Sequence, residues 1–134
     1  MEYGNQITTP LKFHKLNQFF LLPFGIVSCL FDLRNELLSI SVLTWFHIID
    51  FVYYLLVIAL MLFTFWGFLG WKIYAYRCVI IYGWTMAAYS GISLLAHLLF
   101  LPNAAIDIAP LLAIRCLYAA FLTNYYRARK SLFL

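Results

Sequence analysis

The sequence predicts an all-α integral membrane protein, an antiparallel four-helix bundle with both termini in the cytoplasm. Of its 134 residues, 66% are hydrophobic and 10% are charged, whereas charged residues make up about a quarter of an ordinary soluble domain. Four long apolar stretches occupy most of the chain, and about 20 apolar residues suffice to cross a bilayer. These spans leave no room for a separate soluble domain.

The charged residues give the expected orientation of the spans. Basic residues lie before the first stretch, between the second and third, and after the fourth: Lys12, Lys15, Lys72, Arg77, Arg127, Arg129 and Lys130. Acidic residues lie in the other two connections: Asp32, Glu36, Asp50 and Asp107. Basic connections face the cytoplasm in membrane proteins. We therefore attribute the net charge of +4 to contact with anionic lipid rather than with nucleic acid.

The first span is predicted at residues 16–31, after a cytoplasmic tail of residues 1–15. Pro23 and Gly25 lie at its centre and are expected to bend the helix. The segment Ile26-Val27-Ser28-Cys29 resembles the cleavage box of a lipoprotein signal, in which Cys29 would be acylated. A retained helix is the simpler interpretation, and cleavage stays open as the alternative.

The connection after the first span is predicted to have two parts. Residues 32–36 are polar and form the first outer connection. Residues 37–46 are apolar but too few to cross the membrane and return, so an interfacial segment anchored by Trp45 and Phe46 is expected there.

The second and third spans are predicted at residues 48–70 and 78–101, joined by a short basic loop at residues 71–77. Small side chains recur every four residues along one face of the third span: Gly83, Ala87 and Gly91. Small residues at this spacing let helices approach closely in lipid. We expect this face to pack against another span.

The fourth span is predicted at residues 106–126, with Pro110 tolerated in its first turns. Three alanines again recur every four residues and predict a second packing face: Ala105, Ala109 and Ala113. Residues 127–134 form a basic cytoplasmic tail.

Five ionisable side chains are predicted to lie in the outer half of the protein, although they are far apart in the sequence: His47, Asp50, His97, Asp107 and Arg115. Charged groups within a span are costly, and each is a candidate functional residue. Arg115 lies two turns into the fourth span and needs a carboxylate or water. Asp50 is the favoured partner and Asp107 the alternative.

This polar cluster has a structural and a functional interpretation. The structural one is an ion pair that fixes helix register, and the functional one is an outward-facing pocket for a small ligand or ion. His47, Asp50 and His97 could together bind zinc, although no metal-binding motif accompanies them. His14 is expected to lie in the solvated tail, and Asn17 and Gln18 at the interface.

No cofactor and no catalytic residue is predicted. The chain contains no phosphate-binding loop, no nucleophile at a recognisable distance from a base, and no redox motif. Its three cysteines have no metal-ligand spacing, and Cys29 and Cys116 are expected to be small apolar packing residues, with a disulfide between them as the alternative.

The order of these features resembles a family of small four-span bacterial inner-membrane proteins, "domain of unknown function 2569". The resemblance depends on Leu22-Pro23, on Asp50 at the start of span two, on Phe65-Trp66 before the basic loop, and on Arg115 in span four. It extends to the C-terminal tyrosine, basic residues and final aromatic: Tyr126, Arg127, Arg129, Lys130 and Phe133. The chain lacks the family's initial glycine-tryptophan pair and has a shorter basic tail. The resemblance implies the fold and the inner membrane, but no activity.

Three functions fit these observations. The leading one is a non-catalytic accessory protein of the cytoplasmic membrane, whose partners are the lipid bilayer and a larger membrane complex or a second copy. The second is a small transporter or channel with a polar site at the outer leaflet. The third is an immunity protein against a pore-forming toxin.

Overall fold

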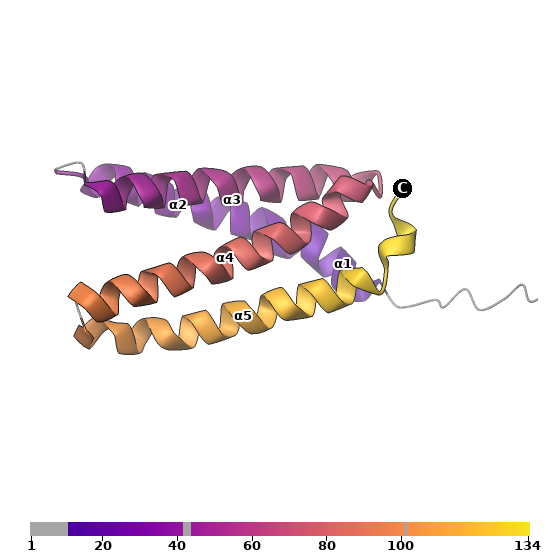
Figure 1. Ribbon diagram of the computed structural model, residues 1–134. Coiled ribbons are helices and arrows are strands. Elements are labelled where there is room, and N and C mark those ends of the chain that lie inside the picture. Colours follow the sequence, from indigo (N-terminus) through magenta and orange to yellow (C-terminus); the bar gives the residue numbers. More distant parts are fainter. Residues whose placement is uncertain (1–10, 42–43, 101) are drawn as a thin grey trace, which may run out of the picture.

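The computed structural model describes residues 11–41, 44–100 and 102–134, and these residues form helices and short connections without any strand (Figure 1). The elements are α1 (Lys12–Leu16), η1 (Asn17–Leu21), α2 (Leu22–Ser39), α3 (Trp45–Leu69), α4 (Ile73–Phe100), η2 (Pro102–Ala104), α5 (Ala105–Arg127) and η3 (Lys130–Leu132). Four helical stretches are long and apolar enough to cross a membrane: 12–39, α3, α4 and most of α5.

The first helical stretch is longer than predicted, because α1, η1 and α2 follow one another directly. Residues 32–36, predicted as a connection, are turns of α2, since no glycine or proline interrupts the chain between Gly25 and Ser39. η1 is a π-helical turn just before Pro23. The irregularity of this span therefore precedes the proline and brings Asn17 and Gln18 into the interior.

Residues 37–46 do not form a separate segment, contrary to the prediction. Residues 37–39 complete α2, and Trp45 and Phe46 begin α3. The remaining connection includes residues 42 and 43, which lie outside the described part of the chain. The apolar side chains of this stretch extend the two helices instead of lying along a separate interface.

The turn between α3 and α4 is also shorter than predicted. Only residues 70–72 separate the helices, because Ala75 lies directly against α3 at Gly67 and holds the first turn of α4 in place. Trp71 makes the turn with a φ of 50°, a left-handed conformation that is uncommon for a residue other than glycine. The turn is therefore fixed by packing around Trp71 and not by a flexible residue.

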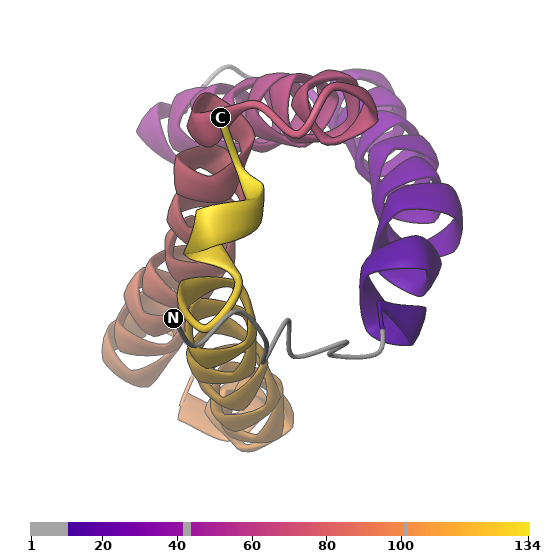
Figure 2. The same ribbon diagram turned by 90° about the vertical axis from the view of Figure 1, so that its right-hand side faces the viewer.

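The four long stretches form an open arc and not a closed bundle (Figure 2). α2 packs along α3, α3 along α4, and α4 along α5. α2 and α5 lie on the two sides of the arc and do not pack along one another. We refer to the two ends by a residue at each: the Trp71 end carries the α3–α4 turn, and the Asp50 end carries the other two connections (Figure 1).

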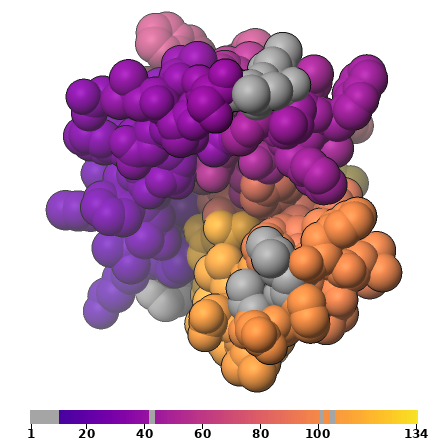
Figure 3. Space-filling model, turned by 90° about the vertical axis from the view of Figure 1, so that its left-hand side faces the viewer, coloured from indigo at the N-terminus to yellow at the C-terminus, as the bar shows by residue number. Residues whose placement is uncertain are grey.

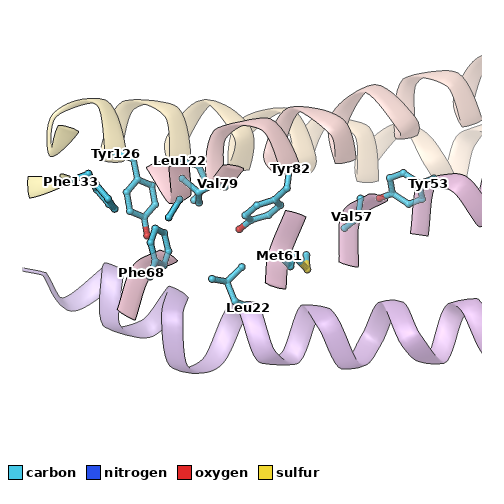
Figure 4. Close-up of a cluster of buried hydrophobic side chains, with 11 residues drawn as sticks. Leu22, Tyr53, Val57, Met61, Phe68, Val79, Tyr82, Leu122, Tyr126 and Phe133 are labelled. Atoms are coloured by element: carbon cyan, nitrogen blue, oxygen red, sulfur yellow. The ribbon is translucent and has the colours of Figure 1, made fainter. Parts of the chain in front are cut away.

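The Trp71 end contains most of the apolar core (Figure 4). Leu22 of α2, Phe68 of α3, and Leu122 and Tyr126 of α5 point toward one another there, and all four are at most 1% exposed. Phe133, from the segment predicted as a basic tail, completes this core. Leu134 donates its backbone N–H to the Trp71 carbonyl at 2.7 Å. The C-terminal segment therefore covers this end of the protein.

The α4–α5 contact uses small residues on α4 but larger ones on α5. A Cβ atom placed on Gly83 would lie 3.1 Å from a Leu122 methyl group and 3.4 Å from the Ala119 Cα. Ala87 is buried on the same face, and Gly91 lies opposite Leu112. The small-residue face of α4 thus meets α5.

The alanine repeat predicted as a packing face on α5 does not face α4. Ala109 and Ala113 are exposed, and the side chain of Ala105 lies outside the described part of the structure. α5 instead turns Leu112, Ala119 and Leu122 toward α4. Because glycine on α4 leaves space for a larger side chain, the repeat of small residues on α5 is not needed.

Candidate functional site

The five ionisable residues of the predicted polar cluster all lie toward the Asp50 end. His47 and Asp50 are in the first two turns of α3, and His97 is in the last turn of α4. Asp107 is exposed in the first turn of α5, where a carboxylate complements the helix dipole. Arg115 lies two turns further along α5 and is half-buried.

Asp50 is bound to α4 through a tyrosine. The Tyr89 hydroxyl donates to Asp50 Oδ1 at 2.5 Å, and the Tyr89 ring stacks on Tyr53 with centroids 3.6 Å apart and an interplanar angle of 7°. The stacked pair fixes the position of the hydroxyl, so the carboxylate is held between α3 and α4.

Arg115 is bound to Ser90, the residue that follows Tyr89 on α4. Its Nη1 donates to Ser90 Oγ at 2.6 Å, and Ser90 is 1% exposed. Arg115 therefore connects α5 to a buried position on α4.

The expected ion pair between Arg115 and Asp50 is not formed. The two residues bind adjacent side chains of α4 instead, and within the described ranges no carboxylate lies within 4.0 Å of the Arg115 guanidinium. The alternative pair with Asp107 is absent there too. Sequence analysis missed Tyr89 and Ser90, because a tyrosine or a serine in an apolar run does not indicate which side chain it will bind.

The two histidines do not join Asp50 in a metal site. His47 Nδ1 pairs with Glu36 Oε1 and so connects the end of α2 to the start of α3. His97 Nδ1 donates to the Ser93 carbonyl of its own helix at 2.8 Å. Among the residues with described positions, no three His, Cys, Asp or Glu side chains come together. The cysteines there are free thiols, so the alternative Cys29–Cys116 disulfide is not formed.

A pocket of about 350 Å³ lies between α3 and α4 at the Asp50 end. Its polar residues are Asp50, Ser93 and His97. The rest of its lining is apolar or aromatic: Phe46, Ile49, Tyr89, Ile92, Ala96 and Phe100. A mainly apolar cavity with a few polar groups is typical of a small-molecule site. We call it the α3–α4 pocket.

A second polar cluster occupies the Trp71 end, and sequence analysis missed it. The Tyr126 hydroxyl lies 3.2 Å from His14 Nδ1 and accepts from Asn17 Nδ2 at 2.9 Å. The His14 ring stacks on Trp71 with centroids 4.5 Å apart. His14 is 2% exposed, Asn17 0% and Gln18 6%. The prediction of a solvated His14 is therefore wrong, and Asn17 and Gln18 lie in the interior of the protein.

This cluster closes the arc at the Trp71 end. Side chains of α1 and η1 reach α5 there, and Phe13 also contacts Phe121 edge to face at 4.8 Å. The signal that could have revealed the cluster is the pairing of polar residues at 14–18 with Tyr125 and Tyr126, since both segments were predicted at the same membrane face.

Replacing Tyr126 with phenylalanine is expected to lower the free energy of unfolding by about 1–2 kcal/mol. The change leaves two buried donors or acceptors, His14 Nδ1 and Asn17 Nδ2, without their partner, and such a group costs about 1–3 kcal/mol. Tyr74→Phe, at a tyrosine that is 40% exposed, is the control. Unfolding in mixed micelles, followed by circular dichroism, measures both, and equal stabilities would contradict a role for the cluster.

Comparisons with protein-family models, with curated proteins and with solved structures gave no match to this chain. The resemblance to the four-span bacterial family therefore stays a prediction.

Proposed function

We propose that the protein is a non-catalytic accessory protein of the bacterial cytoplasmic membrane, with antiparallel spans and both termini in the cytoplasm. The positive residues at the Trp71 end support this orientation, because α1, the α3–α4 turn and the C-terminal segment bring them together at one end. The basic C-terminal segment that follows α5 lies at that end, and so do Lys12 and Lys15. The resemblance to the four-span bacterial family implies the same membrane.

The observation that carries the accessory function is that Arg115, a half-buried cation of α5, has no carboxylate partner among the described residues. The side chains by which the first helical stretch reaches α5, among them Phe13, Asn17 and Leu22, lie at the Trp71 end. Figure 3 looks onto the other end and shows a recess between the side chains of α2 and α3 above and those of α4 and α5 below. Arg115 of α5 is half-buried, and its side-chain partner among the described residues is a serine.

A cation without a carboxylate is costly at membrane depth, although a hydroxyl and water lower the cost. An apolar helix with one acidic residue would cover the sides of α2 and α5 that do not pack along one another. Its carboxylate would neutralise Arg115. The partner we propose is therefore a transmembrane helix of a larger complex that carries a carboxylate at the depth of Arg115.

Affinity isolation from native membranes in a mild detergent, followed by mass spectrometry and mass determination of the particle, tests this function. The expected result is a partner in fixed ratio, with a transmembrane helix that contains Asp or Glu. A particle that contains this chain alone, as a monomer or a dimer, would contradict the accessory function.

A small transporter is the second candidate, and the α3–α4 pocket favours it. The pocket places Asp50 in an apolar cavity near one end of two spans, where a transported solute could first bind. Flux in reconstituted vesicles that is lost in Asp50→Asn, while the protein stays folded, would support transport.

A further inference from the structure

The α3–α4 pocket combines one carboxylate with an aromatic wall. Asp50 lines the cavity together with Phe46, Tyr89 and Phe100. Phe46 of α3 and Phe100 of α4 meet edge to face, with centroids 6.0 Å apart and an interplanar angle of 77°. A carboxylate and several aromatic faces are the two groups that attract an organic cation.

The other polar groups of the pocket also favour a ligand that donates hydrogen bonds. The Ser93 carbonyl can only accept, so His97 must donate to it from Nδ1. In the neutral ring the remaining nitrogen, Nε2, is then an acceptor. Asp50 and His97 therefore both offer acceptors to the cavity.

The charge of Asp50 has no counterion in the described part of the protein. Its one hydrogen bond there comes from the neutral Tyr89 hydroxyl, and no Lys or Arg lies within 4.0 Å of its carboxylate. An anionic ligand would be repelled, and a divalent metal would find too few ligands, since three His, Cys, Asp or Glu groups do not come together among the described residues. A monovalent cation is the complementary ligand.

The rim of the pocket indicates an apolar body on that cation. Ile49, Ile92 and Phe100 are 47%, 57% and 68% exposed, so the pocket is continuous with the apolar outer surface of α3 and α4. A hydrophobic ligand that partitions into the bilayer can reach such a site from the side. The volume of about 350 Å³ lies at the small end of ligand pockets, which limits the ligand to roughly one ring and an ammonium group.

We infer that the α3–α4 pocket binds a small hydrophobic ammonium ion, with the cation on the Asp50 carboxylate and the apolar group against Phe46 and Phe100. This inference goes beyond the accessory function, because the pocket is formed by α3 and α4, whereas the accessory function depends on Arg115 of α5. For the transporter alternative, the same ligand class would be the substrate.

Calorimetric titration of the full chain in phosphatidylcholine nanodiscs tests the inference with two matched probes. Benzyltrimethylammonium carries the charge, and neopentylbenzene has the same shape without it. We expect the cation to bind at least tenfold more tightly than the neutral probe. Equal binding of the two probes, or no binding of the cation at millimolar concentration, would overturn the inference, and this comparison needs no variant.

Variants then locate the site. Asp50→Asn keeps the shape of the side chain and is expected to weaken binding of the cation at least tenfold, whereas Asp107→Asn, at the exposed start of α5, should leave it within twofold. Phe100→Leu should weaken it severalfold. Unchanged affinity in Asp50→Asn, or an equal loss in Asp107→Asn, would overturn the assignment to this pocket. Neither of these two results would test the accessory function, which depends on a partner that pairs with Arg115.

Discussion

Arg115→Leu is expected to reduce the partner isolated with this protein at least tenfold. Breaking a buried charge pair by removing one member costs about 3–5 kcal/mol, and each 1.4 kcal/mol corresponds to a tenfold change in affinity. In the proposed complex, the acidic residue of the partner would lose its counterion. The measurement is quantitative mass spectrometry of the material isolated with wild type and with the variant.

The stability of the isolated protein should not fall in Arg115→Leu, although its recovery of the partner should. Leucine removes a charge whose partner within the described chain is Ser90 Oγ, so Arg115→Leu is expected to unfold at the same denaturant concentration as wild type or at a higher one. Arg115→Lys keeps the charge and should retain most of the partner. Arg127→Leu makes the same change at an exposed position and should have no effect. Equal recovery in Arg115→Leu and wild type would contradict the proposed pairing.

Gly67→Ala is expected to destabilise the fold by about 3 kcal/mol, the upper part of the range for overpacked interiors. An added Cβ would lie 2.5 Å from the Ala75 Cβ and 2.7 Å from a ring carbon of Tyr74. The Ala75 methyl group is fixed to the backbone of α4, so it cannot turn aside. The two helices would have to separate beside their own turn.

A matched glycine three residues away provides the control. An added Cβ on Gly70 would meet only the flexible Lys72 side chain, at 3.4 Å, and Gly70 has an ordinary φ of −111°. Gly70→Ala should therefore change the free energy of unfolding by less than about 0.5 kcal/mol. Unfolding in mixed micelles, followed by circular dichroism, measures both, and equal stabilities of the two variants would show that the α3–α4 contact is looser than described.

The number of long helices could be predicted from the sequence, because each needs a long apolar run and such runs are visible without tertiary information. Helix ends were harder to predict. Residues 32–36 and 73–77 carry charges, which indicated connections, but good helix-forming residues surround these charges and both segments continue their helices. Charge marks where a chain meets water more reliably than where a helix ends.

The candidate site was predicted only in part. Asp50 and His97 do line one pocket, because the start of one span and the end of the next lie at the same end of a helical pair. The hydrogen bonds of Arg115 and Asp50 could not be predicted. Tyr89 binds Asp50 and Ser90 binds Arg115, and neither belongs to a recognisable motif. The burial of His14 depends on the π-helical turn and on the C-terminal segment, which no local pattern reveals.

The most direct test of the proposed complex is photo-crosslinking from Cys29 in native membranes. Cys29 lies on α2, is partly buried and packs against the apolar core, so a thiol-attached crosslinker in a variant with Cys78→Ser and Cys116→Ser would report on the inner side of α2. Leu62→Cys, placed on an exposed position of α3 in a cysteine-free background, is the control. We expect a partner to be captured from Cys29 and not from residue 62. Capture from residue 62 alone, or no capture from Cys29, would contradict a partner helix on the inner side of α2.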